Sequence, residues 1–164
     1  MNTLSKNMNV DNGEKTWLTP PGLMKNLGIF DLDPCCPPNM PWRTAKRMVS
    51  LPENGLTVDW NDNRVWLNPP YGRKAVPFLK KMAEHSGGGI CLIFARTDTS
   101  YWHDYIFPFA YGILFIRGRV NFLSIDGVTK WNAPAPSALV AYSKHDFNIL
   151  TRCGIKGEIV QIRY

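Results

Sequence analysis

The sequence has no long hydrophobic segment. None of the apolar runs in its 164 residues approaches the roughly 20 residues that a membrane-spanning helix needs. The first residues, Met1 to Asn12, are polar and lack the apolar core of a secretion signal. A membrane or secreted protein is therefore not expected, and we predict that the chain works in the cytoplasm.

Clusters of metal-binding residues are also missing. The four cysteines contain no Cys-x-x-Cys pair, and the three histidines are scattered without the spacing of a zinc site. No metal site is expected. In the absence of a secretion signal, reduced thiols are the expected state of Cys35, Cys36, Cys91 and Cys153.

Acidic residues are fewer than basic ones: 13 Asp and Glu stand against 19 Lys and Arg, which gives a net charge of +6. Most of the excess lies between Arg64 and Lys130, where nine basic residues face four acidic ones. A basic surface suits a polyanionic partner, although many basic proteins bind none. With 45% hydrophobic and 12% aromatic residues, the chain fits one globular domain with a substantial core.

Apolar runs alternate with turns along the chain. Residues 90–95 form a continuous apolar run, typical of a central parallel strand buried on both faces, and residues 77–86 carry apolar side chains at helical spacing. Further strands are predicted at 29–33, 64–67, 112–117, 137–143 and, at an edge, 158–162, and further helices near Pro21 and at 101–107. Strands that alternate with helices predict an α/β sheet in a single domain over 16–164, after a flexible lead-in over 1–15.

The sharpest feature is Asn68-Pro69-Pro70-Tyr71, directly after the strand predicted at 64–67. In open α/β sheets, ligands bind at the carboxyl ends of strands. Asn68 offers a side-chain oxygen and Pro69 a backbone oxygen, which are two acceptors for the N–H bonds of a conjugated amine, and the two prolines hold them rigidly. Tyr71 offers a ring face on which a planar group can stack. The motif predicts methylation of such an amine; the alternative is a proline-rich turn that only closes a strand.

The motif is one of several that occur in a fixed order. With them, from about residue 19 to about residue 142, the sequence resembles the phage-type DNA N-6-adenine methyltransferases, small enzymes that use S-adenosylmethionine. The resemblance implies a truncated, Rossmann-like methyltransferase sheet with flanking helices. The motifs are Thr19-Pro20, Leu32-Asp33-Pro34-Cys35, Pro41-Trp42-x-Thr44-Ala45, Gly55-Leu56, Arg64-Val65-Trp66-Leu67-Asn68-Pro69-Pro70-Tyr71-Gly72, Phe94-Ala95-Arg96-Thr97, Arg117-Gly118-Arg119 and Ala135-Pro136-Ser137-Ala138-Leu139.

The resemblance implies S-adenosylmethionine as the methyl donor and no metal. Asp33 matches the acidic residue that typically faces the methionyl ammonium; the alternative is a cap of a helix or turn. The Gly-x-Gly that usually follows is absent, and Cys36-Pro37-Pro38 stands in its place. An Asn-Gly turn is the alternative for the segment that begins at Asn54. The implied cofactor residues are Thr19, Pro20, Asp33, Pro34, Cys35, Asn54 and Asn68, and the implied catalytic residues are Asn68, Pro69, Pro70 and Tyr71.

The resemblance also implies double-stranded DNA as the partner, with the target base flipped out of the helix. Several basic residues follow predicted strands and suit the phosphate backbone, although Arg96 could instead hold the cofactor's carboxylate or be a solvated charge. The loop 133–137 is predicted to lie near the target base. The implied DNA-binding residues are Arg73, Arg96, Arg117, Arg119 and Ser137.

The predicted reaction is direct, in-line transfer of a methyl group to the exocyclic amine of adenine in DNA. Methylation of a protein glutamine amide or of the cytosine amine is an alternative, although Ser usually replaces the Asn in cytosine enzymes. A catalytically degenerate DNA-binding protein is a third, and the missing Gly-x-Gly favours it. The family's association with phages suggests protection of phage DNA in the host cytoplasm, and the sequence leaves the oligomeric state open.

Overall fold

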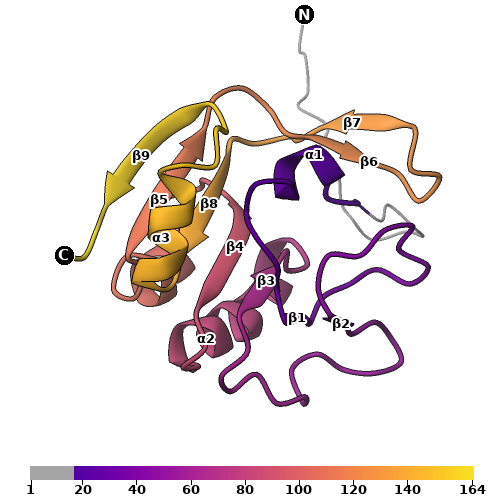
Figure 1. Ribbon diagram of the computed structural model, residues 1–164, viewed down its shortest axis with the longest axis horizontal. Helices are drawn as coiled ribbons and strands as arrows, with labels where there is room; N and C mark the ends of the chain where they lie inside the picture. The colour runs from indigo at the N-terminus through magenta and orange to yellow at the C-terminus, as the bar shows by residue number, and fades with distance from the viewer. Residues whose placement is uncertain (1–16) are drawn as a thin grey trace, which may run out of the picture.

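A mixed seven-stranded sheet lies at the centre of the computed structural model, which describes residues 17–164 (Figure 1). Neighbouring strands are parallel from β2 to β4, whereas β8 is antiparallel to both β4 and β5, and β9 is antiparallel to β5. The predicted α/β class is confirmed at this level; the predicted lead-in over 1–15 lies outside the described residues. In sheet order the strands are β2 (Arg47–Met48), β1 (Leu32–Asp33), β3 (Val65–Leu67), β4 (Gly89–Phe94), β8 (Ser137–Ala141), β5 (Gly112–Ile116) and β9 (Gly157–Gln161).

Strand β4 occupies the middle of the sheet, and all of its residues are buried. Cys91 and Ile93 belong to the apolar core on one face, while Ile90, Leu92 and Phe94 belong to the core on the other. Because both faces are covered, the strand has no polar position and reads as an unbroken apolar run. The predicted central strand is confirmed, although only one of its two neighbours, β3, is parallel to it.

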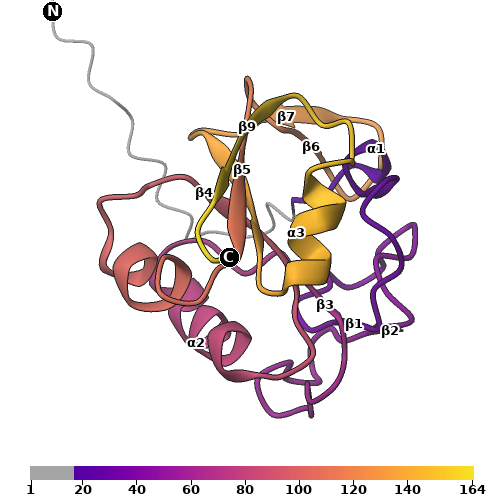
Figure 2. The same ribbon diagram turned by 60° about the vertical axis from the view of Figure 1, so that its left-hand side comes forward.

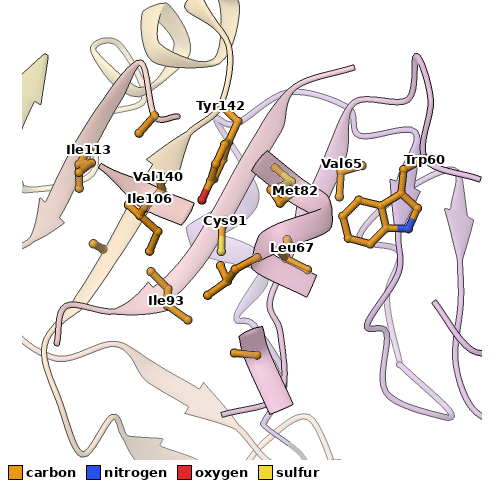
Figure 3. Packing of buried hydrophobic residues seen from close by; sticks show 14 of the residues in the cluster. Trp60, Val65, Leu67, Met82, Cys91, Ile93, Ile106, Ile113, Val140 and Tyr142 are labelled. Carbon is orange, nitrogen blue, oxygen red and sulfur yellow. The ribbon is translucent and has the colours of Figure 1, made fainter. Parts of the chain in front are cut away.

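One face of the sheet, called the α2 face below, is covered by α2 (Val76–Glu84) and by the π-helix η2 (Trp102–Ile106). Leu79 and Met82 of α2 are buried against the sheet, three residues apart on one side of the helix. Figure 3 shows this core, with Met82 among side chains that come from the strands. The helices predicted at 77–86 and 101–107 are thus confirmed, with slightly different ends.

The opposite face, called the hairpin face, is covered by α1 (Pro21–Met24), α3 (Lys144–Leu150) and the β-hairpin of β6 (Asn121–Leu123) and β7 (Lys130–Asn132). Figure 2 shows α2 and α3 on opposite sides of the sheet. Leu18 adds a bridge to the hairpin: its backbone N–H donates to the Leu123 oxygen at 2.8 Å and its oxygen accepts from the Leu123 N–H at 3.0 Å. The hairpin therefore fixes the chain just before α1.

Short elements account for the differences from the predicted secondary structure. The strand expected at 29–33 is reduced to the two residues of β1, and the strand expected at 137–143 ends at Ala141. Strand β2, the hairpin and α3 were not predicted. No helix in the part of the chain from residue 17 onward is both long and apolar enough to span a bilayer.

Candidate active site

One edge of the sheet gathers most of the sequence-predicted site residues. Strands β1, β3, β4 and β5 all point toward this edge, because β4 and β5 are both antiparallel to β8. Strand β8 begins there, with Ser137 opposite Phe94. Asp33 ends β1, and Asn68 follows β3 directly. Residues from distant parts of the sequence are thus brought to a common edge; their individual roles stay predictions.

Asn68 lies at this edge, and the nitrogen and oxygen of its side-chain amide differ in their hydrogen bonding. Its Nδ2 donates to the Oγ1 of Thr19 at 3.1 Å. Among the described residues, neither its Oδ1 nor the backbone oxygen of Pro69 accepts a hydrogen bond. Pro69 and Pro70 restrict the backbone that follows. The loop therefore presents two oxygen acceptors, one from a side chain and one from the backbone, and no donor in residues 17–164 bonds either of them.

Tyr71 lies flat on a residue of the central strand. Its ring centroid is 4.3 Å from that of Phe94, with an angle of 5° between the planes, and Phe122 of the hairpin meets it edge-on at 6.4 Å. The Tyr71 hydroxyl is buried and has no hydrogen-bond partner among the described residues, and burial raises the pKa of this hydroxyl above its usual value. Phe94 therefore occupies one face of the ring, so that a stacking ligand has only the opposite face.

Asp33 is a buried carboxylate at the end of β1, with 3% of its surface exposed. Its Oδ1 accepts from the Cys35 N–H at 3.0 Å, and its Oδ2 accepts a short hydrogen bond from the Thr44 hydroxyl. Burial raises the pKa of Asp33 to about 6 although both hydrogen bonds lower it. No cationic side chain of residues 17–164 pairs with this carboxylate. It is a site at which a ligand ammonium would compensate a buried negative charge.

The loops beside Asp33 are packed closely. A Cβ on Gly55 would lie 1.8 Å from the Pro34 oxygen, so only glycine fits there and the Asn54 turn lies against the Asp33 loop. The Asn54 Oδ1 accepts from the Leu56 N–H at 3.0 Å. This local turn matches the alternative interpretation of Asn54, because its side-chain oxygen is already engaged.

A hollow of about 400 Å³ opens next to the buried carboxylate. It lies between α1 and the segment before β2, and Thr44, which bonds Asp33, contributes to its wall. Trp42 also lines it and approaches the hairpin: a Cβ on Gly127 would lie 3.4 Å from the indole ring. The hairpin thus extends from Tyr71 to Trp42, in the segment before β2.

The predicted DNA-binding residues fall into two groups. Arg73 in the 3-10 helix η1 (Gly72–Ala75), Arg96, Arg117 and Arg119 are exposed, and none forms an ion pair within the described part of the chain. Ser137 differs, because its side chain is buried opposite Phe94 and its hydroxyl has no partner in the same region. It does not lie on the surface as a residue that contacts a DNA backbone would.

Three residues that shape this edge received no site role from the sequence, although Thr44 and Phe94 stand in the motifs of the family resemblance. Phe94 supports Tyr71, Thr44 holds Asp33, and Phe122 belongs to a hairpin that was not predicted. The Asp126-Gly127 pair is a hairpin-turn signal that could have revealed β6 and β7. The contacts of Phe94 and Thr44 have no local signal, since they depend on the packing of distant segments.

The fold and the site together define an α/β protein with a candidate ligand site at the carboxyl edge of its sheet. A family model described as DNA N-6-adenine-methyltransferase (Dam) matches residues 6–152. A related protein, the DNA N-6-adenine-methyltransferase of Haemophilus phage HP1 (strain HP1c1), is 28% identical over 103 residues, which make up 62% of this chain and 42% of that protein. A comparison with the solved structures finds no significant match. The chain belongs to the DNA N-6-adenine-methyltransferase family.

Proposed function

We propose that this protein transfers a methyl group from S-adenosylmethionine to the exocyclic amine of adenine in DNA. The observation that carries the proposal is the pair of unengaged oxygens on the loop of Asn68 and Pro69, in a chain that belongs to this family. The order of the parallel strands, with the loop at their carboxyl edge, supports a truncated Rossmann-like methyltransferase sheet.

The two oxygens would activate the amine. Its lone pair is delocalised into the ring, which makes the nitrogen a poor nucleophile. If Asn68 Oδ1 and the Pro69 oxygen each accept one of its N–H bonds, the nitrogen gains tetrahedral character and the lone pair is localised on it. The N–C bond then forms as the S–C bond of the donor breaks, and the nitrogen afterwards loses a proton to solvent.

The cofactor would be held beside this loop. S-adenosylmethionine supplies an electrophilic methyl group on a sulfonium and carries an ammonium on its methionyl part. Asp33 fits the ammonium, since it is buried, ionisable and without a cationic partner in residues 17–164. Pro34 and Cys35 form the adjoining loop, and Thr19 and Pro20 precede α1 on the same side. Asn54 has the weakest support, because its oxygen bonds Leu56.

The target base would leave the DNA stack, since the amine is inaccessible inside a duplex. The free face of Tyr71 would receive it, with Phe94 supporting the ring from behind. The four exposed arginines near this edge would contact phosphates and hold the duplex in register. In the proposed catalytic step Asn68 and Pro69 would accept from the amine, Pro70 would keep the loop rigid and Tyr71 would stack on the base.

The test is transfer of labelled methyl from S-adenosylmethionine to unmethylated duplex DNA, followed by digestion to nucleosides. We expect label in N-6-methyladenine for the native protein, and a loss of at least about a hundredfold in Asn68→Ala, because one of two preorganised groups at the reacting centre is removed. Cofactor affinity should change little, and the free energy of unfolding should fall by no more than about 1–3 kcal/mol, the cost of leaving the buried Thr19 hydroxyl without its donor.

The matched control is Asn148→Ala. Asn148 is an exposed asparagine on α3, which begins at the opposite edge of the sheet. Its replacement should leave transfer unchanged. Label in cytosine, or in protein instead of DNA, would replace the proposed acceptor by another; no label together with no cofactor binding would indicate a degenerate binding protein.

A further inference from the structure

The carboxamide of Asn68 has two ends of similar size and opposite chemistry. Its oxygen accepts hydrogen bonds, whereas its nitrogen donates them. Under the proposed function, an amide turned by 180° would point N–H groups at the N–H groups of the target amine. Activity therefore depends on how the carboxamide is held relative to the substrate.

Thr19 is the residue that contacts the nitrogen end. Its Oγ1 accepts from Asn68 Nδ2 at 3.1 Å, and the two residues are 49 positions apart in the sequence. Thr19 is 2% exposed, so water does not compete freely for this hydrogen bond. With the nitrogen engaged, Oδ1 is the end of the carboxamide that has no donor among residues 17–164. We infer that Thr19 is a positioning residue that anchors the Asn68 carboxamide at the candidate reaction centre.

The backbone around Thr19 is itself fixed. Leu18 is fully buried and forms two backbone hydrogen bonds with Leu123 of the hairpin, at 2.8 and 3.0 Å. Pro20 follows, with a φ of −65° that its ring enforces. The backbone of Thr19 is thus held between a strand-like bridge and a proline, which fixes the point from which its side chain contacts Asn68.

The same hairpin also contacts the second element of the site. Phe122, next to Leu123, meets the ring of Tyr71 edge-on. One hairpin therefore contacts Tyr71 directly and, through Leu18, holds the segment that carries Thr19.

The inference rests on the proposed function and differs from the expectation that Thr19 binds the cofactor. Thr19→Val removes the acceptor at nearly constant size, and Thr19→Ser keeps the hydroxyl while it removes a methyl group. A positioning role predicts that kcat falls about tenfold in Thr19→Val, the value of one lost hydrogen bond, while Thr19→Ser stays within about twofold of the native protein. The affinity for S-adenosylmethionine should stay constant in both variants.

A second measurement follows the amide directly. The side-chain NH₂ resonances of Asn68 in the ¹⁵N-labelled protein should shift in Thr19→Val and return in Thr19→Ser. Thr19→Ala replaces Thr19→Val if the valine variant does not fold, as judged by thermal unfolding.

The outcomes separate the two levels of inference. A native protein that transfers no methyl group to adenine overturns the proposed function, and this inference with it. An active protein in which Thr19→Val keeps its kcat and its Asn68 resonances overturns the positioning role alone. A loss of affinity for S-adenosylmethionine at constant kcat also overturns it, and makes Thr19 a cofactor ligand instead.

Discussion

The two faces of the sheet differ in whether their buried polar atoms have hydrogen-bond partners. On the α2 face, the indole N–H of Trp60 donates to the Gly55 oxygen at 2.8 Å, and that of Trp102 donates to the Phe94 oxygen at 3.0 Å. On the hairpin face, Tyr71 and Ser137 each have a buried hydroxyl that finds no partner in residues 17–164. Within residues 17–164, the Trp42 indole, which lies against the hairpin, is the third and last such atom.

This difference indicates that the α2 face mainly stabilises the fold, whereas the hairpin face also carries the candidate site. A buried polar group without a partner costs about 1–3 kcal/mol, so folded proteins rarely keep one without a compensating use. The α2 face has none and holds a continuous apolar core (Figure 3). The hairpin face, which also carries Asn68 and Thr19, accepts this cost next to the site where a polar ligand is proposed to bind. Mutations in the core of the α2 face should therefore change stability alone, whereas mutations of the polar residues around the candidate site on the hairpin face should also change activity.

The largest effect on stability is expected from Leu79→Ala. Leu79 is fully buried on the α2 face, and its truncation leaves a cavity beneath the sheet. We expect the free energy of unfolding to fall by about 2–5 kcal/mol in chemical denaturation, while methyl transfer per folded molecule stays near the native value. Lys80→Ala, its exposed neighbour on the same helix, should change stability by less than about 0.5 kcal/mol. A loss of activity in fully folded Leu79→Ala would contradict the prediction that the α2 face affects stability alone.

An intermediate effect is expected from Asp33→Asn. Burial raises the pKa of Asp33 to about 6 from 3.8, so the folded protein binds this proton more tightly than the unfolded chain does. The contribution of Asp33 to stability is therefore favourable at low pH and is lost as pH rises from about 4 to 6. Above pH 6 the buried charge is a cost, and Asp33→Asn should raise the free energy of unfolding by roughly 1–3 kcal/mol, a gain that shrinks toward pH 4.

The affinity for the cofactor should depend on pH in the opposite direction to the stability contribution of Asp33: it should fall as the pH falls. If the Asp33 carboxylate holds an ammonium, the affinity for S-adenosylmethionine should fall about tenfold between pH 7 and pH 5, and calorimetric titration should find this dependence missing in Asp33→Asn. Asp104→Asn, an exposed aspartate on η2, is the control and should change neither quantity. If the Asp33→Asn variant binds the cofactor as tightly as the native protein does, Asp33 is not a cofactor-binding residue.

Long, buried elements were predictable from the sequence, and short or long-range features were not. Strand β4 stands out because every one of its side chains is apolar, and the rigid Asn68 loop because its residue types are unusual. Strands β1 and β2 have two residues each, too few to show a period. Helix α3 has seven, and its signal was the Ser143 side chain, which accepts from the Asp146 N–H as an N-cap.

The contacts that complete the candidate site follow from tertiary structure. The bond between Thr19 and Asn68 depends on where the hairpin holds the chain before α1, and the stack of Tyr71 on Phe94 depends on how β3 and β4 align. Ser137 begins β8, as the strand predicted at 137–143 implies, but its side chain is buried, which does not suit the predicted contact with DNA. Residue types led to the predicted methyl-transfer chemistry, whereas strand register and packing decide which side chains lie at the candidate site.

The smallest expected effect is also the most direct comparison of the two faces. Tyr142 on the α2 face donates its hydroxyl to the Tyr105 oxygen at 3.0 Å, whereas the hydroxyl of Tyr71 has no partner among the described residues. Tyr142→Phe should lower the free energy of unfolding by about 1 kcal/mol, because it leaves a buried oxygen without its donor. Tyr71→Phe keeps the stack on Phe94 and removes only the unpaired hydroxyl, so it should leave stability unchanged or raise it by up to about 1 kcal/mol. Equal losses in the two variants, measured by denaturant unfolding, would mean that the Tyr71 hydroxyl is satisfied in solution and that the two faces do not differ in this respect.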